Sequence, residues 1–202
     1  MKAGIIDYGA GNLRSAANAV HSLGIEPRIV TRGADFEDLT HLILPGVGSF
    51  GDSMEELQAR SLVDPIREWI AQDRPFFGIC VGYQLLFERG EESPGIDGLG
   101  IFKGSVGTFP DDGRKIPHMG WNAAQLIEPS DPLWAGLGES PFFYFVHSFF
   151  PTPTDTDVVA AETEYEGVRF ASVIRRGNLV ATQFHPEKSQ QAGLRLLKNF
   201  LA

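Results

Sequence analysis

The sequence lacks the features that mark secreted, membrane-spanning or nucleic-acid-binding proteins. It has one cysteine, Cys80, so no disulfide can form within the chain, and a free thiol fits a reducing cytoplasm. No apolar run approaches the length of a membrane span, and residues 1–7 predict a short strand rather than a signal peptide. Basic residues are scarce: 17 Lys and Arg stand against 26 Asp and Glu, and the net charge of −9 argues against a general nucleic-acid binder. We therefore expect a cytoplasmic protein that binds neither membrane nor nucleic acid.

The first half of the chain alternates short apolar runs with segments of helical periodicity. Strands are expected at residues 3–6, 27–31, 41–44 and 75–79, and helices at 13–23, 54–62 and 64–70, with Asp64 as the N-cap of the last one. Such alternation predicts an α/β fold with an open, mostly parallel sheet and helices on both of its faces.

After Arg89 the pattern changes to successive strands. An acidic loop rich in Gly and Pro, with Glu91 and Glu92 as solvated charges, is expected at 90–98, and a hairpin turn at 176–178. Strands are expected at 101–109, 123–127, 142–149, 158–163, 170–175 and 179–184, followed by a helix that Ser189 caps. We predict an antiparallel extension of the parallel sheet within one domain, residues 1–202.

The stretch Pro75 to Glu88, P-F-F-G-I-C-V-G-Y-Q-L-L-F-E, predicts a sharp turn from a strand into an amphipathic helix. Cys80 stands at the turn between Gly78 and Gly82, as in a nucleophile elbow, where larger neighbours would clash. A helix N-terminus favours the thiolate, and the N–H of Val81 would point to where an oxyanion forms. A lone cysteine is more often a small buried hydrophobe, so this motif alone leaves both interpretations open.

A second stretch, Q-F-H-P-E-K-S at residues 183–189, favours catalysis. His185 is a candidate general base for the thiol, and Glu187 is a candidate to orient the imidazole. Nucleophile, base and orienting carboxylate can be far apart in sequence and adjacent in the fold.

Two glycine-rich segments follow predicted strands. In P-G-V-G-S-F-G-D, residues 45–52, three glycines within six residues let backbone N–H groups approach a ligand, which makes it a candidate oxyanion strand. In D-Y-G-A-G-N, residues 7–12, the third glycine of the dinucleotide fingerprint and the P-loop Gly-Lys-Ser/Thr are both missing, so a tight turn is the better interpretation. The turn still lies at the carboxyl end of a strand, where open α/β sheets bind ligands and partners.

Together these motifs resemble the class I glutamine amidotransferase family. G-I-C-V-G-Y-Q at 78–84 and H-P-E at 185–187 carry the resemblance. The segments at 7–12 and 45–52, H-M-G-W-N at 118–122 and Y-F-V-H-S at 144–148 are similar to the amidotransferase subunits of imidazole glycerol phosphate synthases, which act in histidine biosynthesis. The resemblance implies a single glutamine amidotransferase type-1 domain with a flavodoxin-like fold.

The resemblance also implies a mechanism. Cys80 would attack the side-chain amide of glutamine to give a γ-glutamyl thioester and ammonia, while His185 moves the proton and Glu187 holds the imidazole. The oxyanion hole would use Val81, Val47 and Gly48. Glutamine would be held by Gly46, Gln84, Ser148 and Phe149. No metal and no organic cofactor is implied.

The implied partner is a cyclase subunit, a (β/α)₈ barrel, in a heterodimer. It would receive unhydrated ammonia and make imidazole glycerol phosphate and an aminoimidazole carboxamide ribotide. Interface residues would be Asn12, Met119, Trp121, Asn122 and Lys188. Trp121 and Asn122 are expected in a loop between strands, where an exposed Trp is typical of an interface anchor. His118 is expected to be packed or to face the partner, and His147 to have a role in the core or the glutamine pocket, rather than to act as bases.

Three other functions are weighed against this one. The chain could be the glutaminase of another amidotransferase, against which H-M-G-W-N at 118–122 argues. It could be a cysteine hydrolase of γ-glutamyl substrates that needs no partner. A non-enzymatic docking subunit is disfavoured because Cys80, His185 and Glu187 are all present.

Overall fold

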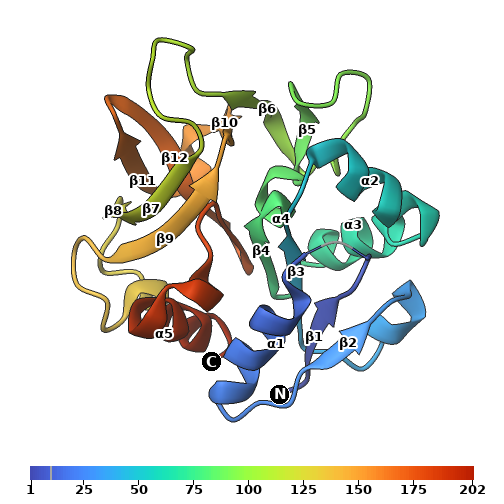
Figure 1. Ribbon diagram of the computed structural model, residues 1–202. Coiled ribbons are helices and arrows are strands. Elements are labelled where there is room, and N and C mark those ends of the chain that lie inside the picture. The colour runs from blue at the N-terminus through green and yellow to red at the C-terminus, as the bar shows by residue number, and fades with distance from the viewer. Residues whose placement is uncertain (10) are drawn as a thin grey trace.

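A computed structural model describes residues 1–9 and 11–202 (Figure 1). Ala10, in the expected turn at 7–12, lies outside the described residues. The elements up to the elbow are β1 (Ala3–Ile6), α1 (Leu13–Ser22), β2 (Arg28–Val30), the 3₁₀ helix η1 (Gly33–Phe36), β3 (His41–Gly46), α2 (Phe50–Ala59), α3 (Val63–Ala71), β4 (Phe76–Cys80) and α4 (Val81–Gln84). Those that follow are β5 (Phe87–Gly90), β6 (Phe102–Thr108), β7 (His118–Ala123), β8 (Gln125–Leu126), η2 (Pro132–Trp134), β9 (Phe142–His147), β10 (Phe149–Pro153), η3 (Thr156–Val158), β11 (Val159–Tyr165), β12 (Val168–Arg176), β13 (Leu179–Thr182), η4 (Pro186–Lys188) and α5 (Gln190–Phe200).

The main sheet has the strand order β2-β1-β3-β4-β13-β12-β11-β8. Its first five strands are parallel, and β12, β11 and β8 continue it in antiparallel fashion. Every residue of β1, β4 and β13 is buried, as expected where helices or other layers cover both faces of parallel strands. The predicted α/β fold with an antiparallel extension is therefore confirmed.

Helices lie on the two faces of the parallel strands. In the view of Figure 1, α1 and α5 lie in front of the sheet and α3 lies behind it. Phe200 of α5 packs edge-on against Phe77 of β4, with ring centroids 5.0 Å apart. On α3, the indole N–H of Trp69 donates to the carbonyl of Pro75 at 3.0 Å, which ties that helix to the start of β4. The central strand β4 is thus fixed by packing on both sides.

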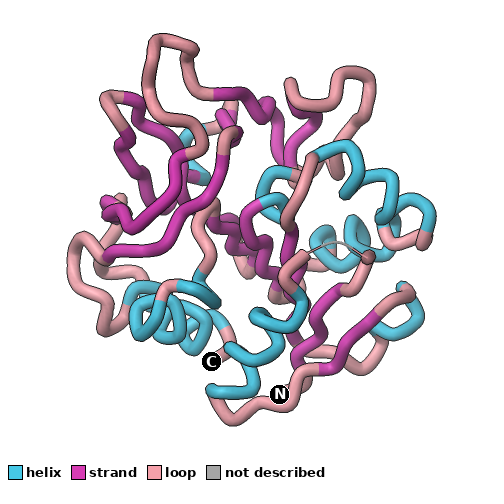
Figure 2. Tube along the Cα trace, in the orientation of Figure 1, coloured by secondary structure: helices cyan, strands magenta, loops and turns pink. Residues whose placement is uncertain are grey.

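Beyond the elbow the chain forms two smaller sheets beside the main one, a three-stranded sheet β10-β6-β5 and the two-stranded ribbon β7-β9. Figure 2 shows these strands gathered in one half of the molecule, opposite the half in which helices and strands alternate. Trp121 and Asn122, expected in a loop, instead lie in β7, which pairs along its whole length with β9. The sequence of β7 has a glycine at its centre and little β-branched bulk, so the cross-strand partners and not local propensity make it a strand.

The helix after Cys80 is shorter than predicted. It ends after one turn, and Phe87, expected on its apolar face, begins β5 instead. The carbonyls of Leu85 and Leu86 accept the N–H groups of Leu99 and Ile101, at 2.7 and 2.8 Å, so the following loop takes the acceptors that a longer helix would have used. Asp64 is also not the N-cap of α3, which begins at Val63 with Leu62 as its N-cap. Among the residues that the structure describes, every helix is too short or too polar to span a bilayer.

Candidate active site

Cys80 sits at the end of β4 in a strained backbone conformation. Its φ of 54° and ψ of −109° place a residue with a side chain in the region that glycine prefers. Such conformations cost about 1–3 kcal/mol and persist only where the surrounding structure enforces them. In the sheet, Cys80 at the end of β4 pairs with Gly46 at the end of β3. The two parallel strands therefore end at the same edge of the sheet. The predicted elbow geometry is present at this position.

Three glycines allow the backbones around the elbow to approach. A Cβ on Gly82 would lie 2.1 Å from the carbonyl oxygen of Leu44, and one on Gly78 would lie 2.8 Å from that of Gly82. A Cβ on Gly46 would lie 2.4 Å from the backbone nitrogen of Gly82. These neighbours are backbone atoms that cannot move aside, so β3, β4 and α4 can meet only through glycine at these positions. Because α4 is a single turn, its local N–H groups rather than a long helix dipole would act on the sulfur.

His185 and Glu187 form a buried pair. Nδ1 of His185 lies 2.8 Å from Oε1 of Glu187, and the two side chains are 1% and 2% exposed. Burial disfavours the imidazolium, but the nearby Cys80 and Glu187 side chains outweigh it and raise the pKa of His185 to about 10. Nε2 of His185 has no hydrogen-bond partner among the described residues. That nitrogen is therefore available to exchange a proton with a group beside Cys80.

Ser189 fixes the short helix η4 that carries this pair. The expected capping role of Ser189 on α5 is absent, since its side chain makes no cap hydrogen bond. Its hydroxyl donates instead to the carbonyl of His185 at 2.6 Å and accepts the N–H of Tyr144 at 2.9 Å. The N–H of His185 donates in turn to the carbonyl of Tyr144 at 3.0 Å. The base is thus held against β9 by three bonds.

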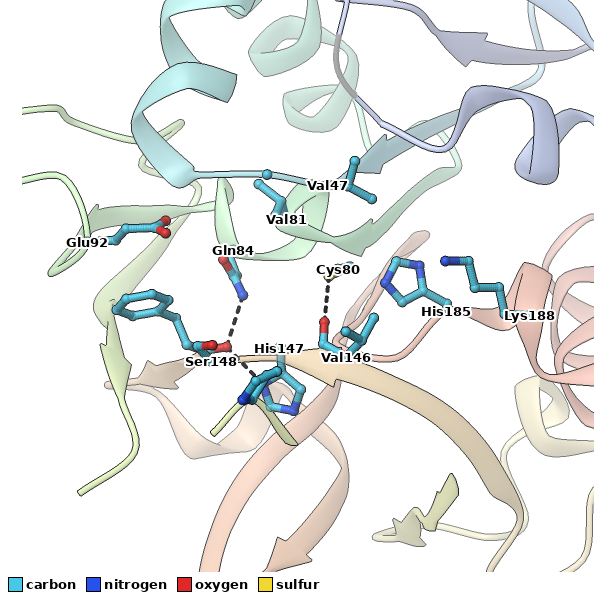
Figure 3. Close-up of a pocket in the computed structure, with 13 residues that line it drawn as sticks. Val47, Cys80, Val81, Gln84, Glu92, Val146, His147, Ser148, His185 and Lys188 are labelled. Atoms are coloured by element: carbon cyan, nitrogen blue, oxygen red, sulfur yellow. Dashed lines mark hydrogen bonds between the residues drawn. The ribbon is translucent and has the colours of Figure 1, made fainter. Parts of the chain in front are cut away.

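These residues surround a cavity of about 320 Å³, at the small end of the range for small-molecule sites (Figure 3). Eight lining residues were predicted for the catalytic, oxyanion or substrate-binding site: Val47, Gly48, Cys80, Val81, Gln84, Ser148, Phe149 and His185. Lys188, predicted for the partner interface, also lines the cavity. Gly46, predicted to bind substrate, is not among them; it lies beneath the cavity at the end of β3. Glu187 also lies outside the lining, behind His185.

Three lining residues were not expected at the site: Glu92, Pro117 and Val146. His147, expected in the core or the glutamine pocket, lines the cavity as well. Glu92 was expected to be a solvated loop charge. Its Oε2 instead accepts the N–H of Phe50 at 2.8 Å, at the N-terminus of α2, and Figure 3 shows it at the opposite end of the cavity from His185. No local pattern in the sequence marks it, because its role depends on the loop folding back over α2. The buried ring of His147 faces both the core and the cavity.

A network of buried amides connects the cavity wall. Nε2 of Gln84 donates to the carbonyl of Phe149 at 3.0 Å and to Oε1 of Gln183 at 3.2 Å. Nε2 of Gln183 lies 3.7 Å from the sulfur of Cys80. The sulfur also lies 4.0 Å from the carbonyl oxygen of Val146, as Figure 3 shows.

Two histidines, His147 and His118, help to hold the carbonyl of Phe149 in place. Nδ1 of His147 donates to the oxygen of Phe149 at 2.9 Å, and Nε2 of His147 lies 2.9 Å from Nδ1 of His118. Burial lowers the pKa of His118 to about 4 and that of His147 to about 3, so both rings are neutral near pH 7. Both are packed, as the sequence predicted, and neither is positioned as a second base.

The predicted interface residues do not all lie in one place. Met119 and Trp121 project from the outer face of the β7–β9 ribbon and are 60% and 46% exposed. Lys188 is exposed at the cavity, and Asn12 is half-buried where α1 begins. The side chain of Asn122 turns inward and donates to the carbonyl of Glu164 at 2.9 Å.

Comparison with known proteins gives a consistent result. A family model described as glutamine amidotransferase class-I matches residues 4–202. The chain is 47% identical over 197 residues to an imidazole glycerol phosphate synthase subunit HisH of Rhodopirellula baltica, covering 97% of this chain and 95% of that one. It is 46% identical over 198 residues to the protein of the same name from Synechococcus sp. (strain JA-3-3Ab), covering 98% and 91%.

Solved structures show the same fold at lower identity. The structure described as a glutamine amidotransferase has a TM-score of 0.77 at 23% identity, covering 100% of this chain and 97% of that one. PurLQS from Thermotoga maritima gives a TM-score of 0.78 at 21% identity, covering 99% and 97%. On the family model and the relatives above 40% identity, this chain belongs to the class-I glutamine amidotransferase family.

Proposed function

We propose that the chain is the glutaminase subunit of an imidazole glycerol phosphate synthase, acting in the cytoplasm as a single domain of residues 1–202. The observation that carries the proposal is the strained Cys80 at a cavity that also contains the free ring nitrogen of His185. The relatives of 46–47% identity, which bear the name of that synthase's subunit, support this choice over other amidotransferases.

In the proposed reaction Cys80 attacks the side-chain carbonyl carbon of glutamine. Because the pKa of His185 is raised to about 10, its ring is protonated near pH 7, so Cys80 attacks as the thiolate of an ion pair and the proton on Nε2 passes to the departing nitrogen, which leaves as ammonia. A water molecule then gives a proton to His185 and adds to the thioester carbon, and the carbon–sulfur bond breaks to release glutamate. Glu187, 2.8 Å from Nδ1, keeps the ring oriented and stabilises its charged form.

The oxyanion of each tetrahedral intermediate needs donors beside Cys80. We assign these to the backbone N–H groups of Val81 and of the segment Val47–Gly48, which line the same cavity. Removing one donor of this kind typically costs on the order of a hundredfold or more in turnover.

The other end of the cavity suits the amino-acid end of glutamine. Both hydrogens of the Gln84 amide are used by Phe149 and Gln183, so Gln84 offers its carbonyl oxygen to the cavity. Glu92 adds a carboxylate at that end, and both groups favour an α-ammonium group. Ser148 lines the cavity on the side facing Gln84 (Figure 3).

The proposed partner is a cyclase subunit with a (β/α)₈ barrel, joined in a heterodimer. The outer face of β7–β9 supports this, because exposed Met119 and Trp121, paired with half-buried Val146 and Tyr144, form an apolar strip that ends at the cavity. Exposed aromatic residues of this kind are typical interface anchors. Ammonia would pass directly from Cys80 to the cyclase, which would make imidazole glycerol phosphate and aminoimidazole carboxamide ribotide.

The test is reconstitution of the purified chain with a cyclase subunit. We expect a complex of the two chains and synthesis of imidazole glycerol phosphate with glutamine as nitrogen donor. Hydrolysis of glutamine without any binding of the cyclase would favour a glutaminase of another amidotransferase or a partner-independent γ-glutamyl hydrolase. Binding without hydrolysis under any condition would favour a docking subunit.

A further inference from the structure

Gln183 contacts the reacting sulfur and belongs to no role assigned so far. It follows β13, and its side chain is completely buried. Its backbone N–H donates to the carbonyl of Ser172 at 2.9 Å, which fixes where the side chain starts. Its amide nitrogen lies 3.7 Å from Sγ of Cys80. A distance in this range is ordinary for an N–H group that donates to the large sulfur atom.

The surrounding network determines which end of the amide faces the sulfur. The carbonyl of Phe149 can only accept, so the atom of Gln84 that contacts it at 3.0 Å must be the amide nitrogen. The same nitrogen contacts Gln183 at 3.2 Å, so the contacted atom of Gln183 must be its oxygen. The remaining end of Gln183, its NH₂ group, therefore faces Cys80.

The Phe149 carbonyl that sets this orientation is itself held in place. His147 donates to it from Nδ1, which leaves Nε2 of His147 as an acceptor for Nδ1–H of His118. Nε2 of His118 in turn accepts from the side-chain amide of Asn122 at 3.3 Å. In this series of hydrogen bonds each residue donates to the next, from Asn122 to Phe149. None of the donors and acceptors can exchange roles without leaving a buried polar group unpaired.

We propose that Gln183 is a further catalytic residue, whose amide N–H donates to the sulfur of Cys80 and stabilises the thiolate. This inference rests on the proposed role of Cys80 as the nucleophile. A hydrogen bond to a charged acceptor is about twice as strong as one between neutral groups, so it favours the thiolate over the thiol. The same N–H stabilises the sulfur when the carbon–sulfur bond of the thioester breaks and its electron pair returns to Sγ. Gln84, and behind it His147 and His118, are positioning residues for this donor.

The test measures the reactivity of Cys80 directly, without glutamine. Alkylation of the purified chain by iodoacetamide is followed across pH, because only the thiolate reacts. Two variants remove the donor: Gln183→Glu keeps an oxygen that can accept from Gln84, and Gln183→Met removes the donor without adding charge. Ser172→Ala is the matched control, since it deletes a buried hydroxyl on the neighbouring strand that bonds Ala161 at 3.2 Å and does not contact the sulfur.

We expect both Gln183 variants to be alkylated about tenfold more slowly near neutral pH, with the midpoint of the pH profile moved upward by about one unit. Ser172→Ala should keep the profile of the parent chain. Apart from the carboxyl that Gln183→Glu adds, the titratable side chains around the sulfur are the same in all variants; they are His185 at the N-cap of η4, Lys188 on η4, Tyr8 after β1, His147 on β9 and Glu92 across the cavity.

A parent-like profile in both variants would overturn the inference. So would slowing in Gln183→Glu alone, which would identify the added charge as the cause, or equal slowing in Ser172→Ala. If neither Gln183 variant folds, NMR of the parent chain decides. The chemical shift of the Gln183 side-chain amide should change with pH at the same midpoint as the alkylation rate. A chemical shift that does not change at this midpoint would overturn the inference. Slowed alkylation in a chain that never hydrolyses glutamine would refute the proposed function and with it the catalytic role of Gln183, and would leave only the hydrogen bond from Gln183 to the sulfur standing.

Discussion

Glu187 holds His185 through Nδ1, 2.8 Å from its carboxylate, and so leaves Nε2 as the ring nitrogen without a partner among the described residues. Only Pro186 separates the two residues: His185 is the N-cap of the short helix η4 and Glu187 lies within it. Because the pair is local, it can be predicted from the sequence. Its position beside Cys80 cannot, because that depends on the parallel pairing of β13 with β4.

The first prediction concerns this pair. Replacing Glu187 with Gln keeps an acceptor for Nδ1 but removes the charge that helps to raise the pKa of His185 to about 10. We expect turnover to fall by at least about tenfold, because the imidazolium that donates to the leaving nitrogen loses its counter-charge. Steady-state glutaminase assays of the complex measure this. Glu162→Gln, which loses only a surface ion pair with Arg169, is the control.

The same variant should change how stability depends on pH. The pKa of His185 in the folded chain, about 10, lies above its ordinary 6.5, so protonation of the ring stabilises the folded state fully below pH 6.5. That contribution is lost as the pH rises through about 10. Urea unfolding across this window should show a smaller loss of unfolding free energy for Glu187→Gln than for the parent chain. Equal losses would mean that Glu187 does not support the raised pKa.

A second prediction isolates the nucleophile. Cys80→Ala should abolish glutamine-dependent synthesis, because the thioester cannot form. Synthesis from added ammonium salts should continue in the complex with the cyclase, since that route bypasses Cys80. Residual hydrolysis of glutamine at the parent rate would exclude Cys80 as the nucleophile, and loss of both routes would point to a damaged complex instead.

The elbow was predictable from sequence because its requirements are local. Gly78 and Gly82 flank Cys80 within five residues, and a strand-to-helix turn needs small neighbours. The parallel core was predictable for the same reason, since strand and helix periodicities alternate before it. The one-turn length of α4 was not, because Leu85 and Leu86 are engaged by a loop whose course no local pattern specifies.

The remaining misses also depend on long-range pairing. Trp121 and Asn122 lie in a strand only because β9 lies beside them. Glu92 reaches the cavity only because its loop folds over the start of α2. Gln183 appeared beside His185 in a recognised motif, yet its contact with the sulfur depends on the direction of an amide network that spans four elements.

A third prediction tests the close packing under the elbow. Gly82→Ala would place a Cβ 2.1 Å from the carbonyl oxygen of Leu44, a backbone atom, so the strands must shift. We expect a loss of about 1–3 kcal/mol in unfolding free energy together with reduced turnover. Gly107→Ala is the matched control, because its Cβ would meet Glu91 at an ordinary 3.5 Å. Thermal or urea unfolding of both variants measures the difference, and equal stabilities would contradict the packing argument.

A fourth prediction addresses the outer face of β7–β9. Trp121 is 46% exposed and touches Tyr144 with ring centroids 6.2 Å apart, so its removal opens no deep core cavity. Trp121→Ala should weaken cyclase binding by about 2 kcal/mol or more while unfolding stays near that of the parent chain. Calorimetric titration with the cyclase gives the affinity. Ile29→Ala, at a similarly exposed residue on edge strand β2, should bind normally. A large drop in stability with unchanged binding would assign Trp121 to the core.

The last prediction concerns control of the oxyanion donors. Gly48 has a φ of +97°, which only glycine adopts freely, and nothing lies within 4 Å of a Cβ placed there. The peptide between Val47 and Gly48 can therefore rotate at little steric cost, and a partner that prefers one orientation would shift its population. We expect the isolated chain to hydrolyse glutamine slowly and to be activated by the cyclase when the nucleotide substrate is bound to it.

Three glutaminase assays test this: the chain alone, with the cyclase, and with the cyclase plus its substrate or an analogue. Turnover should rise strongly only in the third. Gly48→Pro fixes φ near −65° and should remove most of that rise, because a misdirected donor leaves the oxyanion unstabilised and costs on the order of a hundredfold. Gly24→Ala is the matched control, since Gly24 also has a positive φ of 81° and open space around it but lies at the far end of α1. Equal turnover in all three assays would refute control by the partner while leaving the roles of Cys80 and His185 intact. A Gly48→Pro chain that folds, binds the cyclase and is still fully activated would show that the switch lies elsewhere.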